Sequence, residues 1–171
     1  MINRLILLGI LLEGKMHGYQ LNEYVKHVMS LYADLKRSTT YFTLGQLEKE
    51  GYVSHETERE GKRPERRVYS ITEKGKKYFY ELLRVSISSY VPVYSSDNIT
   101  VTFMDKLEIQ EVRQLMKAKK MKIQSELKKF NEIPDHQGSL KYAVDHSIAY
   151  LETDLRWVEG ILKDISAEQE N

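Results

Sequence analysis

The sequence has 171 residues, of which 41% are hydrophobic, and a formal net charge of +1. This length suits one or two small domains, and the apolar content suffices for a core without metals or disulfides. Because cysteine is absent, thiol redox sensing, cysteine nucleophiles and thiolate zinc sites are excluded. Residues 1–96 have a charge balance of +4 and residues 97–171 a balance of −3, which indicates two parts with different roles.

An apolar run, Leu5–Leu12, follows Arg4 near the start of the sequence. Eight residues are far too few to span a bilayer. Charged residues, in Glu13-Gly14-Lys15, follow where a signal peptide would have small cleavage-site residues. The run therefore predicts a buried first helix, no membrane partner and a cytoplasmic protein.

Two more short helices are expected before residue 51. Leu21, Val25 and Val28 recur at helical spacing. Ser38-Thr39-Thr40 offers a choice of N-caps for a third helix that runs to about Glu50, and Gly51 stands where a left-handed residue ends a helix. We expect the inner face of the third helix to include Tyr41, Leu44 and Leu47. Its outer face should carry polar side chains that reach base edges or phosphates, namely Thr39, Thr43, Gln46 and Lys49 or Glu50.

A hairpin and a fourth helix follow. Residues 52–59 show no helix signal, residues 60–65 form a turn with glycine and proline, and residues 66–71 suit a return strand. Thr72 is the expected N-cap of the next helix. Three helices, a hairpin and a helix are typical of a winged helix-turn-helix, whose third helix enters the major groove. The hairpin tip has four cations that can follow phosphates or reach into a minor groove: Lys62, Arg63, Arg66 and Arg67.

Several short motifs occur in order over residues 1–85. After the apolar first helix they are His17-Gly18-Tyr19-Gln20-Leu21, Thr40-Tyr41-Phe42-Thr43-Leu44, the segment 47–53, and the segment 68–75 after the arginine-rich hairpin. This ordered set resembles the PadR family of bacterial transcriptional regulators. The resemblance implies a DNA-binding winged helix, a C-terminal helical dimerisation domain and, for many members, repression relieved by a small molecule. A basic residue is common where this chain has Gln46, which leaves the operator sequence open.

The second half of the sequence predicts long helices after a connection. Serines and Pro92 interrupt the helical signal after residue 85; residues 97–104 suit either a strand or a helix, and the resemblance favours a short helix. A helix resumes near Leu107, and residues 134–138 form a turn. The last helix has a heptad-like apolar seam, part of which we expect to meet a second chain: Val144, Ile148, Leu151, Leu155, Val158, Leu162 and Ile165. Two such helices resemble the longer PadR subfamily, that of virulence activators.

The predicted fold is therefore mainly α with a small β-hairpin. It comprises an N-terminal winged helix-turn-helix (residues 1–90) and a C-terminal long-helix dimerisation domain (residues 91–171). Tyr19 and Tyr41 suit packing as well as contact with the DNA backbone. The residues predicted to contact DNA are Tyr19, Ser38, Thr39, Thr40, Tyr41, Thr43, Gln46, Lys49, Lys62, Arg63, Arg66 and Arg67.

The predicted function is a sequence-specific DNA-binding regulator that binds a pseudo-palindromic operator as a homodimer. Its predicted partners are double-stranded DNA and a second copy of the chain, and the resemblance adds a small-molecule effector, as for many members of the family; no cofactor and no metal are expected. Repression follows from the resemblance. The alternative is a winged helix that contacts only proteins, which would have no need of four cations on its hairpin. No glycine-rich phosphate loop, recognisable Ser-His-Asp grouping or metal cluster occurs in the sequence, so no enzyme is expected.

Overall fold

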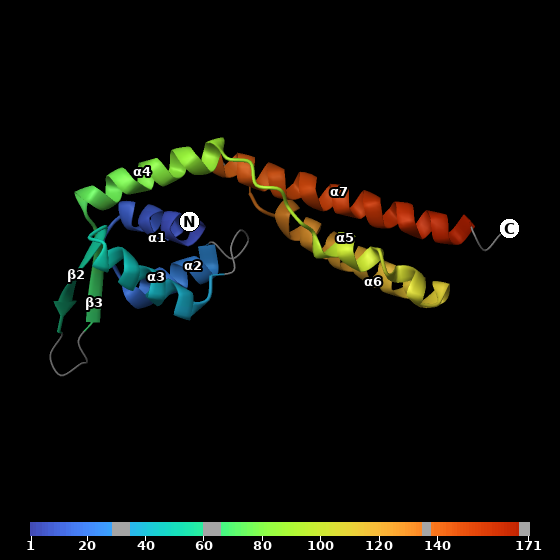
Figure 1. The fold of residues 1–171 in the computed structure, drawn as a ribbon, viewed down its shortest axis with the longest axis horizontal. Helices are drawn as coiled ribbons and strands as arrows, with labels where there is room; N and C mark the ends of the chain where they lie inside the picture. The colour runs from blue at the N-terminus through green and yellow to red at the C-terminus, as the bar shows by residue number, and fades with distance from the viewer. Residues whose placement is uncertain (29–34, 60–65, 135–137, 168–171) are drawn as a thin grey trace. The chain divides into compact units, whose positions relative to one another are not determined.

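The computed structural model describes residues 1–28, 35–59, 66–134 and 138–167, and its elements follow one another as drawn in Figure 1. They divide between two compact units, Met1–Val91 and Pro92–Asn171. The first unit contains α1 (Ile2–Leu12), β1 (Met16–His17), α2 (Gly18–Val28), α3 (Arg37–Lys49), β2 (Val53–Glu58), β3 (Arg66–Ile71) and α4 (Glu73–Ser88). The second contains α5 (Ser96–Val101), the 3-10 helix η1 (Met104–Lys106), α6 (Ile109–Asn131) and α7 (Ser139–Ala167). The prediction of a mainly helical fold with a small β-hairpin is confirmed.

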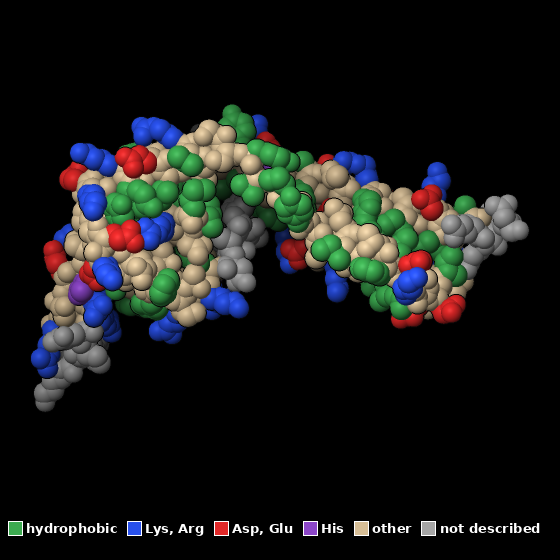
Figure 2. Space-filling view, in the orientation of Figure 1, with side chains coloured by type: hydrophobic (Ala, Val, Ile, Leu, Met, Phe, Trp, Pro, Cys, Tyr) green, Lys and Arg blue, Asp and Glu red, His purple; other side chains and the backbone are tan. Residues whose placement is uncertain are grey.

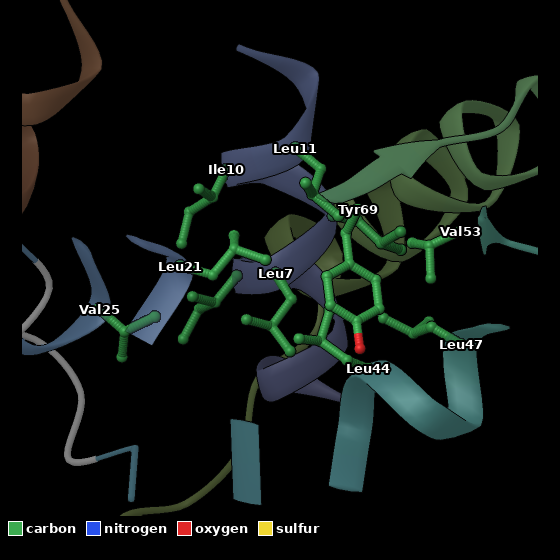
Figure 3. Close-up of a cluster of buried hydrophobic side chains, with 11 residues drawn as sticks. Leu7, Ile10, Leu11, Leu21, Val25, Leu44, Leu47, Val53 and Tyr69 are labelled. Atoms are coloured by element: carbon green, nitrogen blue, oxygen red, sulfur yellow. The ribbon is translucent and has the colours of Figure 1, made fainter. Parts of the chain in front are cut away.

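Helix α1 is at the centre of the first unit. It packs against α3, α4 and β3, and its apolar side chains are buried on several faces, as expected for a core helix. Figure 3 shows Leu7 among side chains contributed by the neighbouring elements. They include Leu21 and Val25 from α2, Leu44 and Leu47 from α3, Val53 from β2 and Tyr69 from β3. The predicted buried first helix is thus confirmed.

The strands form a three-stranded antiparallel sheet in the order β1-β3-β2. The hairpin between β2 and β3 runs in register from Val53 opposite Ile71 to Glu58 opposite Arg66. The predicted hairpin is present, but the third strand was not predicted. β1 has only two residues, and it is a strand only because Met16 and His17 pair with Tyr69 and Val68.

The end of α3 is joined closely to the start of α4. Gly51 has a φ of 78° and its N–H donates to the Glu48 carbonyl, while the Tyr52 N–H donates to the Leu47 carbonyl. These two bonds close α3 with a Schellman motif, as the position of Gly51 predicts. Thr72 is the N-cap of α4, where its hydroxyl accepts a hydrogen bond of 3.0 Å from the Gly75 N–H. The predicted cap of the fourth helix is therefore confirmed.

The second unit consists mainly of α6 packed against α7. The Arg113 guanidinium, near the start of α6, donates to the carbonyl of Ile165, near the end of α7, so the two helices are antiparallel. Lys119 on α6 also forms an ion pair of 2.5 Å with Asp97 on α5. Residues 96–101 are helical, as the family resemblance favoured. Among the described residues, no helix has both the length and the apolar composition needed to cross a membrane.

The predicted α7 seam contributes partly to packing within the chain. Val158 and Ile165 are buried, whereas the other five members of the seam are half-buried. A seam used only between two chains would leave Val158 and Ile165 exposed in a single chain. Part of the stripe is therefore already covered within the same chain.

Candidate nucleic-acid interface

The exposed face of α3 differs from the predicted one. The buried side chains are Thr40, Thr43, Leu44 and Leu47. The exposed residues follow at helical spacing on the other side: Arg37, Ser38, Tyr41, Phe42, Gly45 and Lys49. We call these six residues the outer face of α3. Thr39 and Gln46 are half-buried at its edges.

Three predictions for α3 are corrected by this arrangement. The helix begins at Arg37 after the N-cap Lys36, so Ser38, Thr39 and Thr40 lie within the helix. Thr43 was expected to face outward and is buried, whereas Tyr41 was expected to face inward and is 37% exposed. Thr40 is completely buried, and its hydroxyl donates to the Lys36 carbonyl at 3.3 Å. A threonine can be buried in this way because the backbone satisfies its hydroxyl, so Thr40 and Thr43 present no exposed side chain to DNA.

Two carboxylates at the end of α3, those of Glu48 in its last turn and of the C-cap residue Glu50, are both engaged within the chain. Glu48 contacts Nδ1 of His55 on β2. The Glu50 carboxylate accepts two hydrogen bonds of 2.6 Å from Arg4 on α1, and these hydrogen bonds lower the pKa of the Glu50 carboxyl. The six residues of the outer face therefore include the cations Arg37 and Lys49 and no carboxylate, and the two neighbouring carboxylates are paired, an arrangement that attracts a polyanion.

Two tyrosines at helix starts lie next to arginines. The guanidinium of Arg37 lies 5.7 Å from the ring centroid of Tyr41, and that of Arg66 lies 5.7 Å from the ring centroid of Tyr19. A Cβ added at Gly18 would be 2.9 Å from the Tyr41 ring, so a larger residue there would require the Tyr41 side chain to shift. Both phenols are exposed, which leaves their hydroxyls free to donate to phosphate oxygens.

A side-chain hydrogen bond fixes the start of α2. The His17 N–H donates to Oε1 of Gln20 at 2.9 Å, which satisfies the backbone donor just before the helix in the manner of a capping box. His17 also stacks on Tyr19, with ring centroids 5.4 Å apart. These contacts hold Tyr19 beside the hairpin.

The hairpin presents cations on both of its faces. Arg66 and Arg67 are exposed on β3, opposite Glu58 and Thr57 respectively, and adjacent residues of a strand point to opposite faces. Figure 2 shows Lys and Arg side chains gathered around this end of the first unit. Lys62 and Arg63 lie outside the described residues. Of the two hairpin cations that the structure describes, Arg66 is the one beside a predicted tyrosine.

Sequence reasoning missed three members of the outer face: Arg37, Phe42 and Gly45. Had the inner stripe been assigned to Thr40, Leu44 and Leu47, helical spacing would have placed these three residues outward. In the described part of the chain, no group of three or more His, Cys, Asp or Glu side chains is placed to hold a metal ion.

The second unit contains a hollow of about 380 Å³ beside α5, η1 and α6. Its floor is Val112, and most of its walls are apolar. The ion pair between Asp97 and Lys119 supplies its polar edge. A space of this size and composition is typical of sites for small organic molecules.

The chain is similar to known proteins in sequence. Residues 7–81 match the family described as Transcriptional regulator PadR-like family. The chain is 28% identical over 133 residues to the Negative transcriptional regulator PadR of Bacillus subtilis (strain 168), covering 78% of this chain and 70% of the relative.

Solved structures show the same fold. Bacillus subtilis PadR in complex with operator DNA matches with a TM-score of 0.79 at 22% identity, over 96% of this chain and 99% of that one. The same protein in complex with p-coumaric acid matches with a TM-score of 0.78 at 20% identity, over 97% and 99%. The Vibrio cholerae virulence activator AphA matches with a TM-score of 0.73 at 12% identity, over 97% and 99%.

Proposed function

Because residues 7–81 of this chain form a domain of the PadR-like transcriptional regulator family, we propose that the chain binds a specific duplex DNA sequence through α3 and the β2–β3 hairpin. The observation that carries the proposal is the outer face of α3, which has exposed cations while the two carboxylates at the end of the helix are engaged by Arg4 and His55. In this proposal α3 enters the major groove, where base pairs differ in donor and acceptor pattern. The exposed arginines of the hairpin contact phosphates or enter the minor groove.

The predicted contacts then separate into two groups. Gln46 at the edge of the outer face is a candidate base reader. Lys49 follows it by three residues, and Ser38 and Thr39 are further candidates near the start of the helix. Tyr19, Tyr41, Arg66 and Arg67 are candidates for holding the backbone. We expect the protein to act in the cytoplasm and without catalysis.

We further propose that the protein is a repressor that binds a pseudo-palindromic operator as a homodimer. The name of its Bacillus subtilis relative, a negative regulator, supports repression. The second unit supports a dimer because it exposes large apolar side chains, among them Leu115, Tyr142 and Tyr150, and such surfaces mark contacts with partners. Two winged helices in one dimer would read half-sites about one helical turn apart.

The dimer is tested by sedimentation of the full-length protein and of a Leu155→Asp variant over a range of concentrations. Leu155 is a half-buried member of the α7 seam, so a charge there should weaken a dimer that uses the seam. Circular dichroism of both proteins checks that the helices persist. Sedimentation of the wild type as a monomer at all concentrations would contradict the dimer.

We also propose that a small-molecule effector releases the protein from DNA. Bacillus subtilis PadR has been solved with p-coumaric acid, and the hollow beside α5, η1 and α6 offers space for a ligand in this chain. The effector itself remains to be identified by screening for compounds that lower operator affinity.

Genomic footprinting of the protein with no effector added tests the proposed function. It should yield one or more short sites with two related half-sites. Affinity for such a site should exceed affinity for random duplex by about 10³-fold or more, as is usual for specific regulators. A folded protein that binds neither kind of duplex would instead favour a winged helix that contacts only proteins.

A further inference from the structure

Phe42 lies in the middle of the outer face of α3 and has 69% of its surface exposed. A phenyl ring has no hydrogen-bond donor or acceptor. Its exposure means that most of the ring is not used for packing within the chain, while Leu44 and Leu47 on the opposite side form the core. We therefore look for the role of Phe42 in a binding partner of the outer face and not in the core.

The surroundings of Phe42 indicate a nucleic-acid partner. Arg37 and Lys49 stand on the same face, before and after Phe42 along the helix. The carboxylates nearest to Lys49, those of Glu48 and Glu50, are paired with His55 and Arg4. A surface that has exposed cations at both ends, and whose neighbouring carboxylates are ion-paired, complements a polyanion.

Gly45 leaves room beside Phe42. It follows one helical turn later on the same face, and a Cβ added there would meet nothing within 4 Å. Glycine within a helix is less favourable than alanine, so the fold gains nothing from it at this exposed position. The missing side chain allows a partner to approach the helix closely next to the ring.

In the major groove the only apolar group on a base edge is the C5-methyl of thymine. We propose that Phe42 is a specificity-determining residue that contacts the C5-methyl group of a thymine in each operator half-site. The inference rests on the proposed DNA-binding function and deepens it by naming the base that this position selects. A ring that contacted only phosphates or a protein partner would not distinguish thymine from uracil.

The test replaces the thymines of the footprinted operator one at a time with deoxyuridine, which lacks only the methyl group. Fluorescence anisotropy gives the affinities of wild-type protein, Phe42→Ala and Phe42→Leu for each duplex. The affinity of wild-type protein should fall about three- to tenfold when one particular thymine of a half-site is replaced with deoxyuridine, in keeping with the loss of one buried methyl contact. Phe42→Ala should bind the original operator more weakly and show no further loss at that deoxyuridine. Phe42→Leu should keep part of the discrimination.

Tyr80→Ala is the matched control, because Tyr80 is an exposed aromatic residue on α4. It should retain the wild-type deoxyuridine profile, and circular dichroism checks the fold of every variant. The inference is overturned if the affinity of wild-type protein is unchanged by deoxyuridine at every position. It is also overturned if deoxyuridine at the sensitive thymine lowers the affinity of Phe42→Ala as much as that of wild type. Failure of the wild type to bind the unmodified operator would instead overturn the proposed function, and this inference with it.

Discussion

Arg4 on α1 donates two hydrogen bonds of 2.6 Å to the carboxylate of Glu50 at the end of α3. Lys74 on α4 donates to the backbone carbonyl of the same glutamate at 2.8 Å. Three helices that are distant in sequence are therefore joined at one residue. This junction fixes the end of the helix whose outer face is proposed to enter DNA.

The Arg4–Glu50 pair predicts a specific loss of stability in acid. Its hydrogen bonds lower the pKa of the Glu50 carboxyl in the folded state, so the contribution is present above the unfolded carboxyl pKa. It is lost as the pH falls through the folded pKa. Glu50→Gln should be less stable than wild type near neutral pH, and the difference should shrink in acid. Urea unfolding at several pH values measures this, and a difference that is independent of pH would contradict it.

The structure explains why position 75, at the end of the motif over residues 68–75, is a glycine. A Cβ at this position would overlap the Tyr52 carbonyl, which accepts the Thr72 N–H at 3.0 Å. Gly75→Ala should therefore destabilise the protein by about 1–3 kcal/mol or more, because backbone must move. Gly160→Ala on α7 is the control: nothing lies within 4 Å of its added Cβ, so it should stabilise the helix by about 0.5–1 kcal/mol. Equal melting temperatures for the two variants would contradict the prediction.

Gly45 should separate stability from DNA affinity. Gly45→Ala adds a methyl to the exposed outer face, where the free chain has room for it. The variant should unfold at a higher temperature, with a gain of about 1 kcal/mol, yet bind the operator more weakly because the methyl obstructs close approach. Thermal melts and anisotropy on the same sample measure both effects. Unchanged operator affinity would place Gly45 outside the interface.

Gln46 and Arg67 should differ in what their loss affects. Gln46→Ala should cost about 1–3 kcal/mol on the operator and much less on random duplex, because an amide reads base edges. Arg67→Ala should weaken binding to both and lower the salt slope by about one unit if the arginine meets a phosphate. Titrations of each variant with both duplexes supply the comparison. Equal losses for Gln46→Ala on the two duplexes would remove its role as a base reader.

The elements of the first unit were largely predictable because local signals agreed. The apolar run of α1, the left-handed Gly51 and the Thr72 cap each specify local geometry directly. β1 was missed because its two residues have no pattern of their own; pairing with Tyr69 and Val68 alone makes them a strand. Long-range pairing of this kind is not visible in a short segment.

The candidate site was predicted less well because it depends on the phase of one helix. Treating Thr43 as polar placed it outward and treating Tyr41 as apolar placed it inward, whereas Thr43 is buried and Tyr41 is exposed. Hydrophobicity therefore gave the wrong side at these two positions. The roles of Glu48 and Glu50 were also hidden, since their partners His55 and Arg4 come from other elements.

Affinity of the full-length protein for duplex DNA as a function of salt concentration tests the central claim most directly. Anisotropy titrations with operator and random duplex at two salt concentrations are sufficient, with circular dichroism to establish that the protein is folded. DNA binding through the outer face of α3 and the hairpin predicts measurable affinity for both duplexes at low salt. It also predicts a slope of log affinity against log salt of about −0.9 for each phosphate neutralised. Absence of binding by the folded protein at low salt would contradict the claim.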